Sequence, residues 1–365
     1  MKKLLTICLA VFVFAACGPK THYVINGVAN SPEMDGATVY FYAEEVIDST
    51  IVKDGTFSFE GEIAEPTITL IYIETAKPLS NGREVVMLEP GTIHVDFDRD
   101  TVYGTPLNDD FYAMLSKHNY NSVMKQAWDK YIAMMEADPV SRPALEEEFY
   151  NFRESDITPC VTETFRDMLK SYPDNILGAF AARQLCQEEI LDLSELEQII
   201  TDTNSVLGRD PVLKKKLTQF RNIAATAEGK HFLDFECILA NGEMGHLSDV
   251  IGGKLALVDF WASWCAPCRE EIRTNLIRLA SKYESKGLVV VGVDVWDSPE
   301  KHADAVKELG ITYPQVIDTT TNATTMYGIS GIPHIMLIGP DGTILARELR
   351  GELIEDAIVN AIDLK

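Results

Sequence analysis

The sequence predicts a multidomain protein in which an N-terminal all-β sandwich or barrel and a central helical segment precede a C-terminal α/β domain. Three patterns indicate this: β-rich runs between turn dipeptides, then apolar residues at helical spacing, then alternating strands and helices. The 365 residues suffice for about two or three domains. We expect a signal segment at 1–17, a small β domain at 18–105, a helical region at 106–228 and the α/β domain at 229–365.

The first residues have the pattern of an export signal. Lys2 and Lys3 precede the apolar run Leu4–Phe14, which is shorter than the ~18 residues needed to span a bilayer. The run ends in Phe14-Ala15-Ala16-Cys17, which resembles a bacterial lipobox and implies lipidation of Cys17 and anchoring through several acyl chains. The alternative is a signal cleaved without lipidation, followed by a cysteine that is there by chance.

The formal net charge of −24 argues against nucleic acid as a partner, because a phosphate backbone requires a basic surface. Acidity of this kind mainly keeps a protein soluble. The hydrophobic fraction of 46% is ordinary for folded soluble proteins, so we do not expect wholesale disorder.

The N-terminal part has the pattern of short β-strands. Ala37–Tyr42 and Thr56–Glu60 are rich in β-branched and aromatic residues. Turn dipeptides separate such runs: Asn26-Gly27, Asp35-Gly36, Asp54-Gly55, Asn81-Gly82 and Pro90-Gly91. This spacing predicts a small sandwich or barrel, and no residue cluster in it indicates catalysis.

The middle of the chain has helical periodicity. Ser141–Pro143 and Tyr172–Asn175 have the pattern of helix breaks followed by new N-termini. Apolar residues at helical steps predict core positions: Phe111, Leu115, Met124, Trp128, Tyr131 and Met135. Cys160 and Cys186 also lie here, and they fit either two buried unpaired thiols or a structural disulfide, which only geometry can decide.

Strands and helices alternate from about Gly229 onward. Leu255–Phe260 and Gly287–Val295 are predicted buried strands, and a helix is expected from Cys265 to about Tyr283. The remaining predicted elements are a helix near Pro299–Leu309, a short segment at Pro314–Ile317, strands at His334–Ile338 and Thr343–Leu349, and a helix at Leu353–Leu364.

Cys265-Ala266-Pro267-Cys268 at the start of a helix is the pattern of a redox centre. Free N–H groups and the helix dipole stabilise the thiolate of the first cysteine and lower its pKa. We therefore expect Cys265 to attack a substrate disulfide and Cys268 to resolve the mixed disulfide, which leaves a Cys265–Cys268 disulfide in the protein. No cofactor is required for this exchange.

The competing interpretation of a lone CxxC is half of a zinc site. Structural zinc requires four ligands, usually from two such pairs, and the sequence has no second pair. His334 could supply a third ligand, but no fourth is evident, so we expect no metal.

Three ordered motifs connect these residues to a family. Val258–Cys268 closely resembles the active-site stretch of thioredoxins, Gly331-Ile332-Pro333 resembles their cis-proline loop, and Gly339–Gly342 resembles the hairpin that follows. A long interval between Cys265 and the proline loop, together with Glu271 and the Leu247–Val250 lead-in, resembles the TlpA/ResA-type envelope branch. The preceding domains resemble the N-terminal half of lipoproteins with this architecture.

The resemblance implies roles for five further residues. Asp259, an acid in an apolar strand whose pKa burial should raise, matches the acid that exchanges a proton with the resolving cysteine. Glu271 matches an acid that tunes the thiols, although an exposed first-turn carboxylate is an alternative. Trp264 is expected on the substrate-facing surface, and a cis Pro333 leaves the Ile332 backbone free to pair with an extended substrate.

Two residues depart from the family pattern. His334 stands where the family often has threonine, and it fits either a packing role at the start of a strand or a pH-sensing role. Arg273 stands where many relatives have the proline that kinks the active-site helix. The sequence therefore does not determine whether this helix is kinked.

Pro267 indicates the direction of electron flow. It can neither donate a hydrogen bond to the thiolate nor carry charge, so the dithiol form should be a good reductant. We expect a disulfide reductase of the bacterial cell envelope, as a periplasm-facing or outer-membrane lipoprotein. Its partners would be disulfide-containing client proteins and a membrane electron donor. The alternatives are an isomerase or oxidase, or a binding lipoprotein in which the C-terminal module mainly docks.

Overall fold

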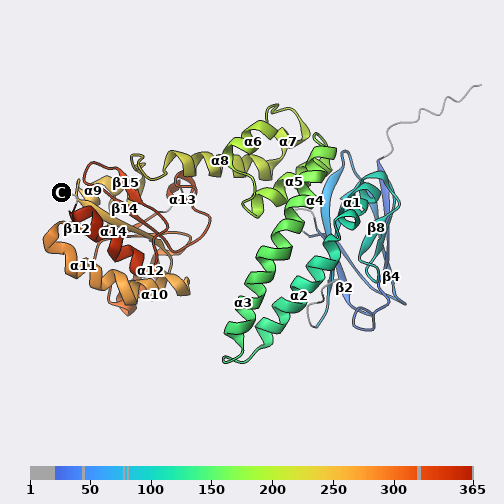
Figure 1. Ribbon diagram of the computed structural model, residues 1–365, viewed down its shortest axis with the longest axis horizontal. Coiled ribbons are helices and arrows are strands. Elements are labelled where there is room, and N and C mark those ends of the chain that lie inside the picture. The colour runs from blue at the N-terminus through green and yellow to red at the C-terminus, as the bar shows by residue number, and fades with distance from the viewer. Residues whose placement is uncertain (1–20, 43–45, 77–78, 80–81, 319–321, 364–365) are drawn as a thin grey trace, which may run out of the picture. The chain divides into compact units, whose positions relative to one another are not determined.

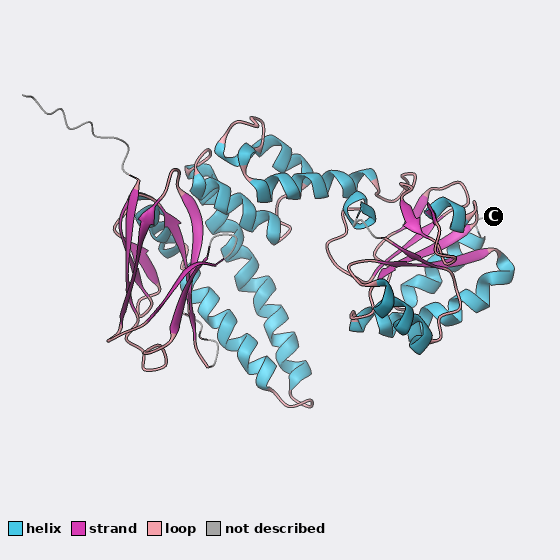
Figure 2. Cartoon of the chain, turned by 180° about the vertical axis from the view of Figure 1, so that it is seen from behind, coloured by secondary structure: helices cyan, strands magenta, loops and turns pink. Residues whose placement is uncertain are grey.

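The computed structural model describes residues 21–42, 46–76, 79, 82–318 and 322–363. Cys17 and the expected signal segment lie outside the described residues. The chain divides into two compact units, Met1–Leu191 with Ile199–Leu213, and Asp192–Gln198 with Lys214–Lys365 (Figures 1 and 2). The helices predicted for residues 106–228 are therefore shared between both units. Among the described helices, none is both long and apolar enough to cross a membrane.

The first unit begins with a sandwich of two four-stranded sheets, ordered β4-β1-β7-β8 and β3-β2-β5-β6. The inner faces meet through aromatic side chains, and the rings of Phe41 and Phe59, one from each sheet, lie 5.4 Å apart. The strands are β1 (His22–Val28), β2 (Thr38–Tyr42), β3 (Val46–Ile51), β4 (Thr56–Glu62), β5 (Thr67–Glu74), β6 (Arg83–Leu88), β7 (Gly91–Asp96) and β8 (Thr101–Tyr103).

One predicted turn is wrong. Asn26-Gly27 lies inside strand β1, where Gly27 pairs with Phe57 of β4. A Cβ atom at Gly27 would lie only 2.0 Å from the Phe57 ring. The glycine therefore makes room for a buried aromatic ring, and its role is close approach rather than chain reversal.

The predicted helical region is helical throughout most of its length. The Asn175 side chain caps α5 by accepting hydrogen bonds from the N–H groups of Leu177 and Gly178, after one of the predicted breaks. The helices are α1 (Pro106–Lys117), α2 (Tyr120–Glu136), α3 (Arg142–Phe152), α4 (Thr158–Ser171), α5 (Ile176–Gln187), α6 (Leu193–Ile199), α7 (Val206–Arg209) and α8 (Pro211–Ala225), with a π-helical turn at Arg153–Ile157.

The predicted apolar core of this region is correct only in part. Phe111 and Leu115 of α1 are buried, but Tyr131 and Met135 of α2 are 39% and 52% exposed. Helices α2 and α3 lie side by side as a hairpin (Figure 1). In a pair of packed helices, each helix covers only one stripe of the surface of the other. The rest of the apolar surface of α2 therefore stays open to solvent.

Cys160 and Cys186 are not joined by a disulfide. Cys160 is half-buried, and its thiol lies 3.6 Å from the carbonyl oxygen of His118, to which it donates a hydrogen bond. Burial raises the pKa of the Cys160 thiol, which disfavours the thiolate form that reacts with disulfides.

The second unit is built on a seven-stranded mixed sheet, ordered β10-β9-β13-β12-β11-β14-β15. Strand β11 is parallel to β12 on one side and antiparallel to β14 on the other, and all of its residues are buried, as its apolar run predicts. The strands are β9 (Glu236–Ile238), β10 (Met244–His246), β11 (Leu255–Trp261), β12 (Leu288–Asp294), β13 (Gln315–Ile317), β14 (His334–Ile338) and β15 (Ile344–Ala346).

Helices cover both faces of this sheet. Residues of α10, α11, α12 and α14 share one hydrophobic cluster with one face of β11, whereas residues of α9 and α13 share the cluster on the other face. The helices are α9 (Leu247–Ile251), α10 (Ala266–Glu271), α11 (Ile277–Tyr283), α12 (Pro299–Leu309), α13 (Asn322–Met326) and α14 (Glu352–Asp363). The C-terminal domain is thus a three-layer α/β/α structure, and it has the thioredoxin-like arrangement that the sequence predicts.

The active-site helix is interrupted although it lacks the proline of many relatives. A π-helical turn at Ile272–Leu276 separates α10 from α11, and Arg273 lies inside this turn. A π turn inserts an extra residue into the helix and shifts its face, as a proline kink would. In this chain the active-site helix is therefore interrupted by a π-helical turn and not by a proline.

Candidate active site

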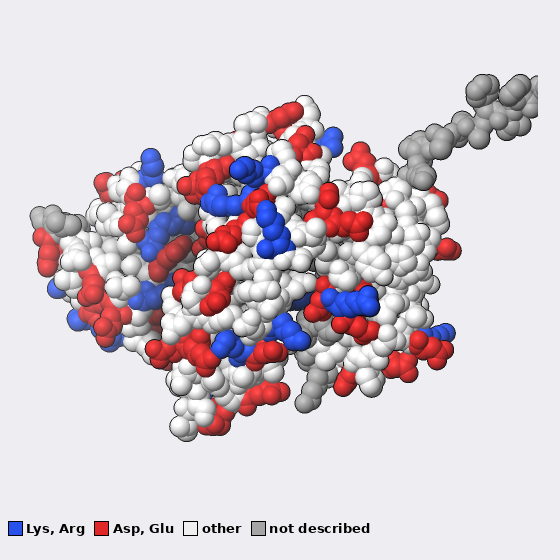
Figure 3. All heavy atoms as spheres, turned by 45° about the vertical axis from the view of Figure 1, so that its right-hand side comes forward, with Lys and Arg blue, Asp and Glu red and all other residues white. Residues whose placement is uncertain are grey.

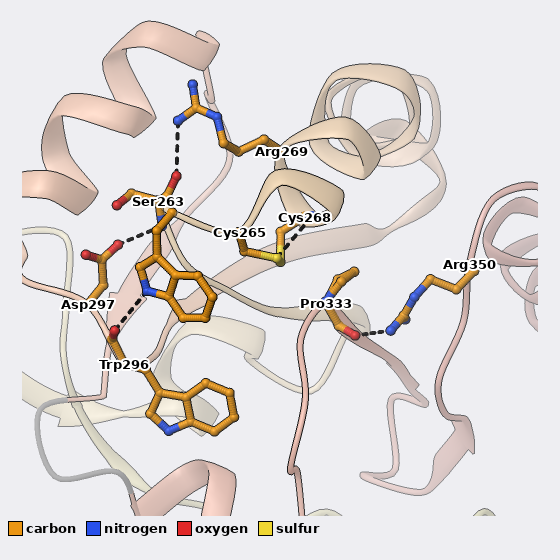
Figure 4. The surroundings of a disulfide bond; sticks show 9 residues. Ser263, Cys265, Cys268, Arg269, Trp296, Asp297, Pro333 and Arg350 are labelled. Carbon is orange, nitrogen blue, oxygen red and sulfur yellow. Dashed lines mark hydrogen bonds between the residues drawn. A yellow bond between two sulfur atoms is a disulfide. The ribbon is translucent and has the colours of Figure 1, made fainter. Parts of the chain in front are cut away.

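Cys265 and Cys268 form a disulfide at the N-terminus of α10 (Figure 4). Cys265 is the N-cap residue, and its Sγ accepts a hydrogen bond of 3.2 Å from the backbone N–H of Cys268. Cys265 keeps 4% of its surface exposed, whereas Cys268 is fully buried. Cys265 is therefore the more accessible of the two residues, and an N–H group and the helix dipole are in place to stabilise its thiolate.

The loop that carries Cys265 is held from two sides. The backbone N–H of Ser263 donates to the carboxylate of Asp297 at 2.6 Å, and the guanidinium of Arg269 donates to the Ser263 carbonyl at 3.3 Å (Figure 4). Arg269 also binds Glu308 of α12 at 2.5 Å. The position of the loop is therefore fixed by α12 and by the segment between β12 and α12, as well as by its own helix.

Two tryptophans form the surface beside the disulfide. Trp264, 59% exposed, donates from its indole nitrogen to the backbone carbonyl of Trp296 at 3.0 Å. Trp261 is instead fully buried and donates to Gln315, which makes it a packing residue. Sequence reasoning missed Trp296, although it follows β12, and the carboxyl ends of parallel strands such as β11 and β12 meet at one edge of the sheet.

The Ile332–Pro333 peptide bond is cis, as the family resemblance implies. Within the described residues, no hydrogen bond is made to the backbone of Ile332, which leaves its N–H and carbonyl available to an extended chain. The carbonyl of Pro333 accepts a hydrogen bond from the guanidinium of Arg350 (Figure 4). Sequence reasoning missed Arg350, because an arginine in a loop carries no distinctive pattern.

Glu271 is half-buried and bonded at both oxygens rather than exposed. Its Oε1 accepts from the backbone N–H of Gly351 at 3.0 Å, and its Oε2 accepts from the Asn275 side chain at 2.8 Å. Glu270, the preceding residue, is exposed. The carboxylate of Glu271 thus fastens the active-site helix to the loop that also holds Pro333.

Asp259 lies inside the sheet without a hydrogen-bonding partner among the described residues. It shares the face of β11 with Leu257 and Trp261, because side chains alternate along a strand, and the hydrophobic cluster on that face includes Cys268. Burial raises the pKa of the Asp259 carboxyl to about 8, with the charge of Arg350 lowering it and the charge of Glu271 raising it. A carboxyl with such a pKa can exchange a proton near neutral pH.

His334 packs inside the protein at the start of β14. It is buried, and its Nε2 lies 3.3 Å from the guanidinium of Arg347. Burial, with the charges of Arg347 and Arg350, lowers the pKa of His334 to about 3. The imidazole therefore stays neutral near pH 7, which favours packing over pH sensing.

In the described part of the chain, no group of three His, Cys, Asp or Glu side chains is placed to hold a metal ion. The sulfurs of Cys265 and Cys268 are bonded to one another. The Nε2 atom of His334 lies 3.3 Å from the guanidinium of Arg347.

Two parts of the chain match known protein families. Residues 229–347 match the AhpC/TSA family, and residues 23–111 match a domain of unknown function, DUF4369. The thiol:disulfide interchange protein HelX of Rhodobacter capsulatus is 37% identical over 117 residues, which cover 32% of this chain and 63% of HelX. The chain thus matches less than two thirds of the length of HelX.

Two further proteins extend the comparison. The thiol-disulfide oxidoreductase ResA of Bacillus subtilis is 28% identical over 145 residues, which cover 40% of this chain and 79% of ResA. The crystal structure of the thioredoxin domain of a thiol-disulfide oxidoreductase from Bacteroides vulgatus is similar at 31% identity and a TM-score of 0.35, over 37% of this chain and 98% of that domain. HelX and ResA are both named as thiol–disulfide exchange proteins.

Proposed function

We propose that this chain, whose C-terminal domain belongs to the thioredoxin-like AhpC/TSA family, reduces disulfides in client proteins of the bacterial cell envelope. The observation that carries the proposal is the disulfide-bonded cysteine pair at the start of α10, in which Cys265 is 4% exposed and Cys268 is fully buried. This arrangement suits a nucleophile that meets the substrate and a second thiol that resolves the intermediate.

The reaction begins with the dithiol form. The thiolate of Cys265 attacks one sulfur of the client disulfide, and the other client sulfur leaves as a thiolate that takes up a proton. Cys268 then loses its proton to Asp259 and attacks the Sγ of Cys265. The mixed disulfide breaks, and the second client sulfur leaves as a thiolate that takes up a proton. The client has then gained two electrons and two protons, and the Cys265–Cys268 disulfide remains.

The direction of exchange rests on Pro267, which lies between the cysteines. A proline offers the Cys265 thiolate no hydrogen bond and no charge, so the dithiol is not specially stabilised and gives up its electrons readily. Continued turnover requires a dithiol donor at the membrane that reduces the Cys265–Cys268 disulfide. Oxidation or isomerisation of clients is the alternative, and a measured reduction potential separates the two.

Residues outside the described part of the chain support the proposed location in the cell envelope. The apolar run Leu4–Phe14 and the Ala16-Cys17 junction support an exported lipoprotein with Cys17 as the acylated residue. Such an anchor would place the redox centre in the envelope, beside both a membrane electron donor and exported clients.

Variants of the cysteine pair test the function. Cys265→Ser is expected to abolish insulin reduction, because the attacking thiolate is lost. Cys268→Ser is expected to accumulate mixed disulfides, because the resolving thiol is lost. Mass spectrometry of mixed disulfides trapped in cells by Cys268→Ala would identify the clients. Insulin reduction by Cys265→Ser would refute the assignment.

A further inference from the structure

We propose that helix α8 forms one wall of the client-binding cleft, and that Lys214 and Lys215 select client segments with acidic side chains next to the disulfide. This inference rests on the proposed function and adds a substrate class to it. Helix α8 precedes the region that matches the AhpC/TSA family, residues 229–347, so the selecting residues lie outside the family domain.

A cleft of about 710 Å³ lies within the second unit. Lys214 and Lys215 of α8 line one side, Trp296 lines a second, and the segment that ends at Ser330 lines a third. A cleft of this size can hold several side chains of an extended peptide, and it combines an aromatic wall with two cationic groups.

Both remaining walls connect this cleft to the redox centre. The carbonyl of Trp296 accepts the hydrogen bond from Trp264, the residue before Cys265. Ser330 is two residues before Ile332, which forms the cis peptide bond with Pro333. A client strand that pairs with the Ile332 backbone beside Cys265 would therefore carry its neighbouring residues into the cleft.

Helix α8 is fixed to the thioredoxin-like domain by direct contacts. The side chain of Gln219 donates to the carbonyl of Gly328 at 3.1 Å, and the side chain of Asn222 donates to the carbonyl of Thr325 at 2.8 Å. A Cβ atom at Gly328 would lie 2.5 Å from the Ile223 side chain, so a glycine allows the close approach. The two lysines are therefore held at the cleft as part of the same compact unit.

Charge selects the kind of client segment. The chain carries a net charge of −24, and acidic side chains are spread over the face drawn in Figure 3. Lys214 and Lys215 are nevertheless both exposed, and neither forms an ion pair with another described residue. Two uncompensated ammonium groups in a cleft favour carboxylates, whereas a basic client segment would be repelled by them.

Matched peptides test the inference. Two synthetic peptides would each contain one intrachain disulfide and would differ only in carrying two Glu or two Gln residues beside one cysteine. Stopped-flow mixing with the pre-reduced full chain gives a second-order rate constant for each peptide. We expect faster reduction of the acidic peptide, and we expect the double variant Lys214→Glu/Lys215→Glu to lower the acidic-to-neutral rate ratio about five- to tenfold. Salt at 1 M should bring the wild-type ratio close to one, because the Debye length falls to about 3 Å.

Lys216→Glu is the control, because Lys216 adjoins the two lysines on α8 but does not line the cleft. It should keep the wild-type ratio. An equal ratio for both peptides in the wild type, or an equal loss in Lys216→Glu, would overturn the inference. Failure of the wild type to reduce either peptide or 2-hydroxyethyl disulfide would instead count against the proposed function.

Discussion

Glu271 of the active-site helix accepts a hydrogen bond of 3.0 Å from the backbone N–H of Gly351, although 80 positions separate them in the chain. The preceding residue, Arg350, donates to the carbonyl of the cis Pro333. One loop therefore joins the helix that carries the cysteines to the loop expected to hold the client. The charges of Glu271 and Arg350 also shift the pKa of Asp259 in opposite directions.

We predict opposite pH shifts for Glu271→Gln and Arg350→Gln. Loss of the Glu271 charge lowers the pKa of Asp259, whereas loss of the Arg350 charge raises it. The pH at which the resolving step changes rate should move down in the first variant and up in the second. Stopped-flow kinetics of the mixed disulfide across pH measure both shifts. Glu270→Gln, a change of an exposed neighbour, is the control, and shifts of equal sign in the two variants would contradict the prediction.

Asp259→Asn should slow the resolving step far more than it changes the reduction potential. The carboxyl of Asp259 is proposed to take the proton of Cys268, and an amide cannot accept that proton. The first attack by Cys265 should stay fast, so mixed disulfide should build up in a single turnover. Unchanged resolving kinetics would reduce Asp259 to a structural role.

The same carboxyl makes stability depend on pH. The pKa of Asp259 is about 8 in the folded protein, against 3.8 as its ordinary value, so between these pH values the folded chain holds a proton that the unfolded chain has lost. As the pH rises from 3.8 to about 8, the free energy of unfolding of the wild type should therefore fall relative to that of Asp259→Asn. The fall should be up to about 1.4 kcal/mol per pH unit. Parallel urea titrations at several pH values give this difference, and a constant difference from acid to neutral pH would exclude a raised pKa.

Pro267→His should make the protein more oxidising. A histidine before the second cysteine stabilises the Cys265 thiolate of the dithiol form, so the reduction potential should rise by tens of millivolts, with about 30 mV equal to roughly 1.4 kcal/mol. The wild-type value should lie near the thioredoxin end of the scale, about −270 mV, rather than near the DsbA end, about −120 mV. Equilibration with glutathione measures both potentials. A wild-type potential near the DsbA end would favour the oxidase alternative.

Cys17→Ala should release the protein from the membrane or leave it unprocessed. The sulfur of Cys17 is the proposed site of acylation, and no other group at the Ala16-Cys17 junction can take its place. Labelling with a fatty-acid analogue should mark the wild type but not the variant. A wild type that takes up no label would remove the lipoprotein assignment.

Predictions from local sequence patterns were wrong at positions where tertiary packing determines the conformation or the burial of a residue. Asn26-Gly27 has the composition of a turn, but the Phe57 ring requires a glycine inside strand β1. Tyr131 has the spacing of a core residue, yet its position in α2 leaves it 39% exposed. Spacing shows which residues share a face, but only the neighbouring elements decide whether that face is covered.

The sequence by itself determined the redox chemistry, because that chemistry depends on residues close together in the chain. Four consecutive residues, Cys265 to Cys268, follow a buried strand. They supply the two thiols and Pro267, and they mark the start of the helix. The tertiary structure alone decided which distant groups surround them. Trp296 and Arg350 reach the redox site only because the sheet order brings their segments together, and the docking of α8 places Lys214 at the cleft that Trp296 also lines. Their contacts arise from long-range packing, which leaves no local pattern in the chain.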